Sequence, residues 1–209
     1  MSFLLRLALP NVPGSLGRVA SAIGAAGGDI DAIQIVEIGP DGVAIDDVLL
    51  DVVPGAMPDS IVSACNALDG VEVLWISRYA VGGTLSLDLE AVEAMTTHPD
   101  QALEHLVDIV PLTFRADWSA RVRRVSGGRK SLIVQATDSA PSALPWPGEH
   151  LRRVDLDDAE TLAVAAPLGD SEALVVGRRG GPEFLDSELA RLSHLVTLAA
   201  SIARSSILR

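Results

Sequence analysis

The feature that most constrains this chain is the stretch 9–17, Leu-Pro-Asn-Val-Pro-Gly-Ser-Leu-Gly, because it separates two elements of different periodicity. Upstream, apolar residues alternate over 3–9 as they do in a strand. Downstream, apolar residues recur over 16–23 at the spacing of one helix face. Pro10 and Pro13 prevent either element from continuing through the stretch. The sequence therefore predicts a strand, a tight loop and a helix.

The start of this helix is a predicted anion site. Gly14 permits a backbone conformation or a close approach that a side chain would forbid, and Ser15 is the predicted N-cap. The first N–H groups of a helix point outward beside the positive end of its dipole, so a carboxylate could be held there without Arg or Lys. Taken alone, the same residues also fit a plain turn with a cap.

The elements that follow give the loop a context. After Gly27-Gly28-Asp29 we expect a strand at 30–38, a turn at 39–42, a strand at 43–53, a helix at 58–68 and a strand at 71–77. This βαββαβ order, with Asn11-Val12-Pro13-Gly14-Ser15-Leu16 at the first crossover and Gly28-Asp29-Ile30 opening the second strand, resembles the ACT domain. The resemblance covers residues 1–80.

ACT domains are ferredoxin-like regulatory modules that pair and bind small ligands, often amino acids, at the dimer interface between the first loop and a neighbouring strand. The resemblance implies ligand contacts from Asn11, Val12, Pro13, Gly14, Ser15, Leu16, Asp29 and Ile30. Asp29 stands where amino-acid-binding members often have Asn. A carboxylate there could accept a ligand ammonium but would repel a ligand carboxylate.

The side chains of the strand at 30–38 suggest a possible interface on the sheet. Alternation over 30–38 puts Ile33 and Ile35 on one face, which we interpret either as an interface or as ordinary surface hydrophobics. Asp46, Asp47 and Asp51 are expected to be exposed, solubilising charges, because no loop of closely spaced oxygen ligands accompanies them.

A second module follows the Val-Gly-Gly-Thr sequence at 81–84. We expect a linker with a short helix at 81–98 and a domain at 99–209. Within this domain the sequence predicts a helix, strands at 118–125 and 131–137 joined by a turn at 126–129, strands at 162–168 and 173–179, and a terminal helix capped by Asp186.

The segment from the last of these strands through Phe184-Leu185-Asp186 into the terminal helix resembles the end of a GAF domain, over residues 172–205. GAF domains are sensory modules that bind small molecules in a cup over the sheet or serve for dimerisation. The segment 138–160, which would wall that cup, is short and proline-rich here. The predicted fold class is therefore α+β, a ferredoxin-like ACT module followed by a GAF-like antiparallel sheet with flanking helices.

Composition narrows the function classes. The net charge of −12, the pI near 4.6 and the 3% aromatic content disfavour nucleic acid as a partner. The single cysteine, Cys65, excludes an intrachain disulfide and a thiolate metal cage, and its spacing predicts burial on a helix. The four histidines lack short metal spacings, so we expect no metal and no cofactor. No signal peptide and no membrane-spanning segment are predicted, which favours the cytoplasm.

These patterns support three hypotheses. The leading one is a non-catalytic, homodimeric sensor that binds a small metabolite, with an amino acid as first candidate. The second is a structural or regulatory subunit that binds another protein through its apolar sheet face and holds no ligand. The third, a small enzyme using Cys65 or the acidic cluster at 155–160, has the weakest support, and no catalytic residues are predicted.

Overall fold

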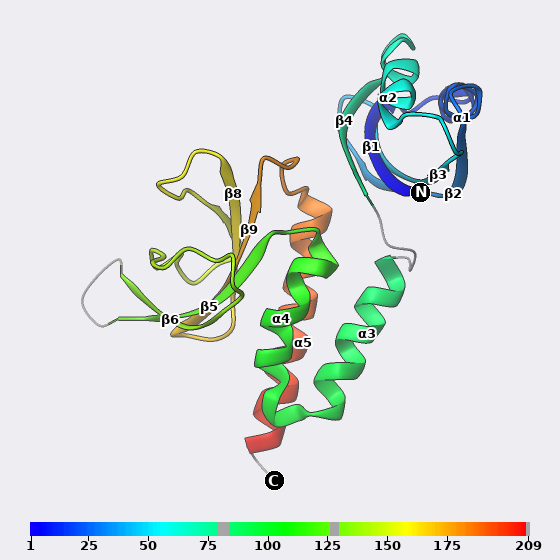
Figure 1. The fold of residues 1–209 in the computed structure, drawn as a ribbon. Coiled ribbons are helices and arrows are strands. Elements are labelled where there is room, and N and C mark those ends of the chain that lie inside the picture. The colour runs from blue at the N-terminus through cyan, green and yellow to red at the C-terminus, as the bar shows by residue number, and fades with distance from the viewer. Residues whose placement is uncertain (79–83, 126–129, 208–209) are drawn as a thin grey trace. The chain divides into compact units, whose positions relative to one another are not determined.

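The computed structural model describes residues 1–78, 84–125 and 130–207 (Figure 1). The chain divides into two compact units, Met1–Val81 and Gly82–Arg209. The domain boundary predicted at 81–83 and the turn predicted at 126–129 lie outside the described residues.

The N-terminal unit is a four-stranded antiparallel sheet with two helices on one face (Figure 1). Its elements are β1 (Ser2–Pro10), α1 (Ser15–Ala25), β2 (Gly28–Ile38), β3 (Val43–Val52), α2 (Pro58–Asn66) and β4 (Glu72–Arg78). The strand order is β2-β3-β1-β4, with β1 and β3 in the centre. This order is that of a ferredoxin-like βαββαβ fold, and the predicted element order is confirmed.

Alternation in β1 builds the core of this unit. The residues predicted to share one face of β1 are buried beneath the helices, together with one stripe of each helix. Cys65 lies on the stripe of α2 and is buried, as its spacing predicted, and this burial raises the pKa of its thiol. The helices therefore stay on the sheet mainly through apolar burial.

The face assignment predicted for β2 is wrong beyond Ile30, because the strand contains bulges. Ile30 pairs with Leu50 but Ala32 pairs with Leu49, so one residue is inserted between them. The insertion shifts the alternation, and Ile33 packs against the core instead of pointing away from it. Ile35 stays more than half exposed.

The opposite face of this sheet carries an ion pair. Arg6 donates to Asp47 on the neighbouring strand through Nε at 2.7 Å and through Nη2 at 3.0 Å. Both side chains are buried. A bidentate pair of this kind fixes the register of β1 against β3. The prediction that Asp47 is an exposed, solubilising charge is therefore wrong, whereas Asp51 is about half exposed.

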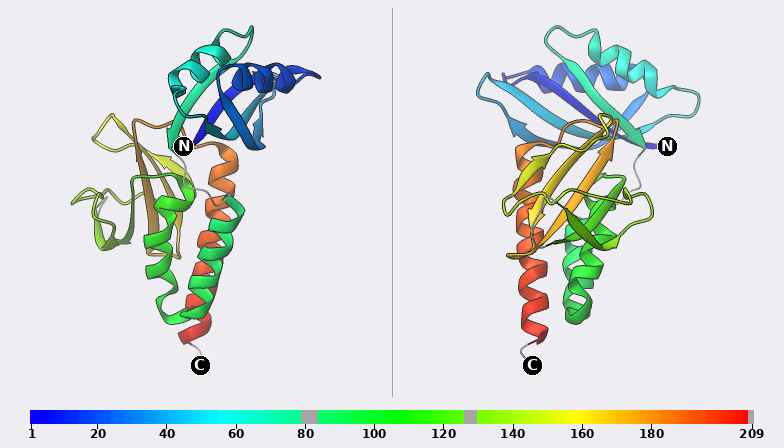
Figure 2. Two further views of the ribbon diagram at one scale, coloured as in Figure 1. Left: turned by 45° about the vertical axis from the view of Figure 1, so that its right-hand side comes forward. Right: turned by 90° about the vertical axis from the view of Figure 1, so that its left-hand side faces the viewer.

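The C-terminal unit is a five-stranded antiparallel sheet with the order β6-β5-β9-β8-β7. Its strands are β5 (Trp118–Arg124), β6 (Ser131–Ala136), β7 (Arg152–Val154), β8 (Thr161–Pro167) and β9 (Glu172–Arg179). Its helices are α3 (Thr84–Thr97), the short 3₁₀ helix η1 (Pro99–Gln101), α4 (Ala102–Phe114) and α5 (Asp186–Ile207). Helices α4 and α5 run side by side along one face of the sheet (Figure 2). The two antiparallel sheets confirm the predicted α+β class.

The start of α5 differs from its predicted cap. Asp186 is the first residue inside the helix, and its carboxylate accepts a hydrogen bond from Arg153 at 3.0 Å. The side chain that caps the helix is Glu188, whose Oε2 accepts the Leu185 N–H at 2.9 Å. This is the glutamate half of a capping box.

The other face of this sheet is covered by the proline-rich segment 138–160. Leu144, Trp146 and Leu156 pack there against the sheet residues Trp118 and Val175. The GAF resemblance implied a ligand cup over this sheet, and these side chains cover part of the face on which they pack.

Gly177 makes room for the Trp118 ring at the centre of this layer. A Cβ added at Gly177 would lie only 2.0 Å from the Cε2 atom of Trp118, which stands opposite it on β5. Glycine is needed here because a side chain would occupy the space of the ring.

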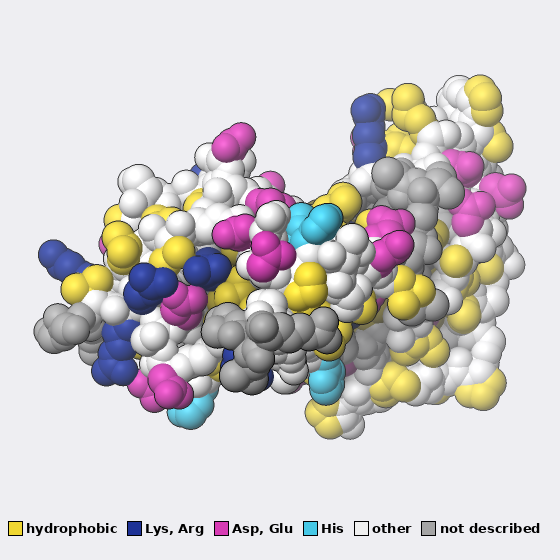
Figure 3. Space-filling model, turned by 90° about the horizontal axis from the view of Figure 1, so that it is seen from below, with side chains coloured by type: hydrophobic (Ala, Val, Ile, Leu, Met, Phe, Trp, Pro, Cys, Tyr) yellow, Lys and Arg dark blue, Asp and Glu magenta, His cyan; other side chains and the backbone are white. Residues whose placement is uncertain are grey.

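Among the described residues, no helix combines the length and the apolar character needed to cross a bilayer. Figure 3 shows one face of the molecule, on which basic side chains are interspersed with acidic ones. The expectation that nucleic acid is not a partner stays a prediction.

Candidate ligand-binding site

The loop between β1 and α1 is held by main-chain hydrogen bonds. The Asn11 N–H donates to the Gly42 carbonyl over 2.8 Å, and the Ser15 N–H donates to the Val12 carbonyl over 3.1 Å. Gly14 has a φ of 90°, in the left-handed region, and a Cβ added there would meet nothing within 4 Å. Glycine is therefore needed at this position for its backbone conformation and not for lack of space.

Helix α1 begins without a side-chain cap. Gly14 occupies the N-cap position, and Ser15 is the first residue inside the helix, so the predicted Ser15 cap is wrong. The first turn holds no acidic residue. The Ser15 N–H is already bonded within the loop, so this turn offers an anion the Leu16 and Gly17 N–H groups and the positive end of the helix dipole.

Two buried polar side chains of this unit, one in the first turn of α1 and one in β3, have no hydrogen-bond partner among the described residues. They are Ser15, which is 3% exposed and has an unpartnered Oγ, and Asp46, which is 2% exposed and has an unpartnered Oδ1. Asp46 pairs with Leu7, a core residue, on the face of the sheet that the helices cover. Desolvation by burial, and secondarily the charge of Asp47, raises the pKa of the Asp46 carboxyl. Asp46 was predicted to be a surface charge, and that prediction is also wrong.

The spacing of the buried residues along α1 gives the level of Ser15 over the sheet. The buried residues of α1, Ser15, Val19 and Ile23, are spaced about 6 Å apart along the helix, close to the spacing of alternate residues in a strand. Ile23 lies over Gly28, since a Cβ added at Gly28 would be 2.6 Å from its Cγ2. Ser15 is two such steps from Ile23, and two steps along β3 from Val52, the partner of Gly28, reach Val48, one step short of Asp46.

Asp29 and Ile30 do not join the loop within one chain. Asp29 pairs with Asp51, which pairs with Ser2 at the start of β1, whereas the loop follows Pro10 at the end of β1. The eight residue steps between these ends span roughly 26 Å. Ile30 packs against the core. The structure thus brings together the predicted residues Asn11 to Leu16, but not Asp29 and Ile30.

Exposed apolar side chains lie at the loop end of the sheet. Val12 in the loop and Ile35 and Ile38 in β2 are each more than half exposed. Ile35 pairs with Asp46 and Ile38 pairs with Ala44, which places both at this end of β2, an edge strand of the sheet. An apolar edge is typical of an association surface.

The sequence carries a signal for the burial of Asp46 that the prediction above did not use. Asp46 alternates in register with Val48 and Leu50 along the strand, so the three side chains are expected on one face, which is apolar at the other two positions. A carboxylate in an apolar row predicts a buried polar group that needs a partner.

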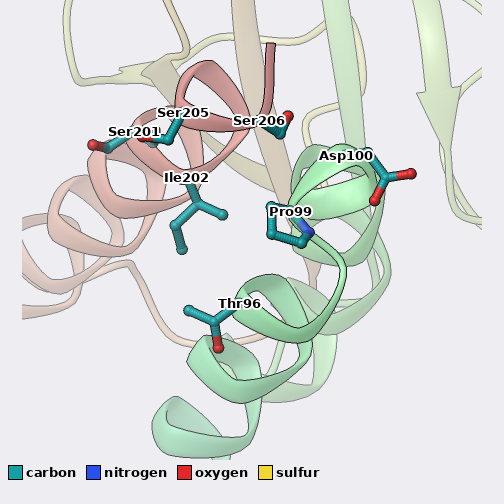
Figure 4. Close-up of a pocket in the computed structure, with 7 residues that line it drawn as sticks. All are labelled: Thr96, Pro99, Asp100, Ser201, Ile202, Ser205 and Ser206. Carbon is teal, nitrogen blue, oxygen red and sulfur yellow. Dashed lines mark hydrogen bonds between the residues drawn. The ribbon is translucent and has the colours of Figure 1, made fainter. Parts of the chain in front are cut away.

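Hollows lined by described residues occur in the C-terminal unit. One, of about 400 Å³, lies between η1 and the end of α5, and Figure 4 shows the residues that line it, including Pro99 and Ile202. A second, of about 300 Å³, lies beside β7 and β8 and contains Arg153 and Asp158. The third, of about 440 Å³, lies between α4 and the strands β5 and β6. Among the described residues, no three His, Cys, Asp or Glu side chains are placed to hold a metal ion.

Comparison with known sequences finds similarity over only a short part of this chain. No family model matches it. NAD-dependent malic enzyme 1 of Bacillus subtilis (strain 168) is 56% identical to it over 36 residues, which make up 17% of this chain. The match spans only 8% of that enzyme's length.

Solved structures similar to the chain include GAF domains. The second GAF domain of DevS from Mycobacterium smegmatis is 17% identical, and the match covers 53% of this chain and 96% of that one with a TM-score of 0.43. The GAF domain of Acinetobacter phosphoenolpyruvate-protein phosphotransferase is 10% identical over 59% of this chain and 94% of that one, with a TM-score of 0.45.

A solved enzyme also resembles part of the chain. The free methionine-R-sulfoxide reductase of Neisseria meningitidis, solved with its substrate, is 9% identical over 63% of this chain and 96% of that one, with a TM-score of 0.48. The similarity to GAF domains covers about half of the chain. The ACT resemblance and its site residues stay predictions.

Proposed function

We propose that this chain is a non-catalytic cytoplasmic sensor, whose N-terminal unit binds a small zwitterionic metabolite, with an amino acid as first candidate. The observation that carries the proposal is that the unit has both an open helix start at α1 and two buried, unpartnered groups, the Ser15 hydroxyl and the Asp46 carboxylate. A carboxylate without a donor is costly in a protein interior, and a ligand ammonium would remove that cost.

The two ends of an amino acid match the two ends of this site. Its carboxylate would accept hydrogen bonds from the Leu16 and Gly17 N–H groups of α1, and the exposed Asn11 amide could donate a further one. Its ammonium would face Asp46. The Ser15 hydroxyl, on the buried side of the helix start, can either donate or accept and so could bond either end.

A second copy would supply Asp29. Because β2 is an edge strand, two copies could pair through it in antiparallel fashion about Ile33. The partner's Asp29 would then stand opposite Glu37, at the loop end of the sheet. The partner's carboxylate would make this end of the sheet more negative, which favours binding of a ligand ammonium there. In this proposal ligand binding and dimerisation are coupled.

Isothermal titration of the full chain with each of the twenty amino acids tests the ligand. We expect one or a few to bind, and we expect Asp46→Asn to weaken that binding at least tenfold, as for the loss of a buried charged hydrogen bond. Asp69→Asn, which changes an exposed carboxylate in a turn, is the matched control and should bind normally. If none of the twenty amino acids binds, the proposal of an amino-acid ligand is refuted. If one binds with the same affinity to Asp46→Asn as to wild type, the proposed site at Asp46 is refuted.

Sedimentation velocity tests the coupling. The bound amino acid should raise the fraction of dimer at a fixed protein concentration, and Asp29→Leu should lower binding without touching the loop. A monomer that binds the ligand at full affinity would contradict the two-copy site.

A second function is supported by the exposed apolar edge at Val12, Ile35 and Ile38. The chain would then be a structural or regulatory subunit that binds another protein and holds no ligand. Affinity purification with mass spectrometry distinguishes this function from that of a ligand sensor. A second protein that copurifies in stoichiometric amount with the wild type, but not with Ile35→Lys, would favour the protein-binding subunit. In either case we propose that the GAF-like unit completes the assembly or transmits the signal.

A further inference from the structure

We propose that helix α3 is a releasable strap on the C-terminal unit, and that Arg191 couples its release to the end of α4. Helix α3 (Thr84–Thr97) is the first described element of this unit after the chain that joins the two units. It lies against both α4 and α5 (Figure 1). A change that reaches the C-terminal unit along the chain therefore meets α3 first.

Apolar burial holds α3 only weakly. Among its described side chains, at 87–97, those with no exposed surface are Ala91 and Met95, whereas Leu89 is 60% exposed. Helix α4 has nearly the same length and buries the side chains of Ala102, Leu106, Val107, Val110, Thr113 and Phe114. An element with few buried contacts opens at a lower free energy than the elements around it.

A bidentate ion pair adds a polar contact near the start of α3. The Nε of Arg191 donates to the Oδ2 of Asp88 over 2.7 Å, and its Nη2 donates to Oδ1 over 2.6 Å. Each side chain is 28% exposed, so water screens the pair only in part. Two parallel bonds fix the direction of the guanidinium as well as its distance from the carboxylate. Because Arg191 lies on α5, this pair fastens α3 to α5.

The same guanidinium also stabilises the end of α4. Its Nη2 donates to the main-chain carbonyl of Thr113 over 3.1 Å, and its central carbon lies 4.5 Å from the centre of the Phe114 ring. The last carbonyls of a helix lack a donor within the helix, so this bond acts as a C-terminal cap. Without Asp88, Arg191 would be a partly buried charge that has lost its carboxylate, and turning toward water would stabilise it. The Thr113 carbonyl would then lose this donor.

The last turn of α4 is sensitive to such a loss because it contains Pro111. Proline has no N–H, so the carbonyl of Val107 lacks its usual helical donor, and the Ser119 hydroxyl of β5 donates to it instead. The last turn is consequently joined to the rest of α4 by one main-chain bond fewer than in a regular helix. Release of α3 would therefore loosen this turn before the rest of the helix.

A second arginine limits the effect. Arg178 donates to the carbonyls of Phe114 and Arg115 over 2.8 and 3.2 Å, and it pairs with Glu188 of α5. None of these bonds involves α3, so they would remain when α3 is released. We therefore expect local loosening at the end of α4 and not unfolding of the helix.

Hydrogen exchange of the full chain, followed by mass spectrometry, tests this coupling with no ligand present, so its outcome is independent of the proposed sensor function. In Asp88→Asn, peptides within 87–97 and within 111–118 should exchange about three- to tenfold faster than in wild type, as for the loss of a partly exposed charged pair. Peptides from 15–25, in the N-terminal unit, should be unchanged. Glu93→Gln removes an exposed carboxylate from the same helix and is the matched control, which should exchange like wild type.

Arg191→Lys separates the paired geometry from the charge. Lysine keeps the charge but cannot form two parallel bonds, so we expect the same two regions to exchange faster. If Asp88→Asn speeds exchange in 87–97 but leaves 111–118 unchanged, Arg191 does not couple the two helices and the proposal is overturned. No change in either region would also overturn it. An equal increase over all peptides of the C-terminal unit would show a loss of global stability and would overturn the local release.

Discussion

Gly14→Ala and Gly55→Ala form a matched pair that separates the ligand loop from the stability of its unit. Gly14 has a φ of 90° and Gly55 a φ of 92°, and a Cβ added at either would meet nothing within 4 Å. Each change therefore adds the same strain, the left-handed backbone of a non-glycine residue, and no steric overlap. That strain costs about 1–2 kcal/mol per residue.

Both variants should lose similar stability. For a domain of 60–100 residues, each kcal/mol lowers Tm by about 4–8 °C. Calorimetry of the full chain, with hydrogen exchange of the peptides from residues 1–78, measures this loss in the N-terminal unit. A Gly14→Ala variant as stable as wild type, beside a destabilised Gly55→Ala, would refute the left-handed loop.

Only Gly14→Ala should affect the ligand. Relief of the strain would turn the loop and displace the first N–H groups of α1, and we expect binding of the titrated amino acid to fall at least tenfold. Gly55→Ala should bind like wild type. An equal loss in both variants would mean that binding follows stability, and the role of the loop would be refuted.

Three further predictions concern stability. The pKa of Asp46 is raised above 3.8 in the folded state, so the free energy of unfolding should fall as pH rises from about 3.8 through the folded pKa. In urea titrations from pH 3.5 to 7, Asp46→Asn should not show this fall and should be more stable than wild type at pH 7. A variant with the same pH dependence as wild type would contradict the burial of Asp46. Gly177→Ala should destabilise the C-terminal unit by about 1–3 kcal/mol through overlap with Trp118, and a double-mutant cycle with Trp118→Leu should recover part of the loss. Gly24→Ala, in open space within α1, should instead stabilise the N-terminal unit by about 0.5–1 kcal/mol, which urea unfolding measures.

The order of elements could be predicted because periodicity reports burial directly. Alternation over 3–9 and the helical spacing that follows predicted β1 and α1 within a residue or two of their observed bounds. Short elements leave too few residues for a period, and β7, with three residues, was not predicted in the segment 138–160.

The site details depended on geometry that periodicity does not encode. The bulge after Ile30 reversed the predicted face of Ile33, and a bulge leaves no clear trace in one sequence. Ser15 fits an N-cap by residue type, yet the left-handed Gly14 takes that position. Asp46 was predicted to be exposed because it is charged, although the alternation of residues along its strand places it on the apolar face.

The distance between the loop and Asp29 has a consequence for mixtures of two defective proteins. In a two-copy site, each binding position takes its loop from one chain and its aspartate from the other. A Gly14→Ala chain and an Asp29→Leu chain, each weakened in binding when alone, would form hybrids with one intact position and one that is doubly impaired. Mixing them should restore binding with half the wild-type stoichiometry per hybrid, whereas a site built within one chain would stay silent.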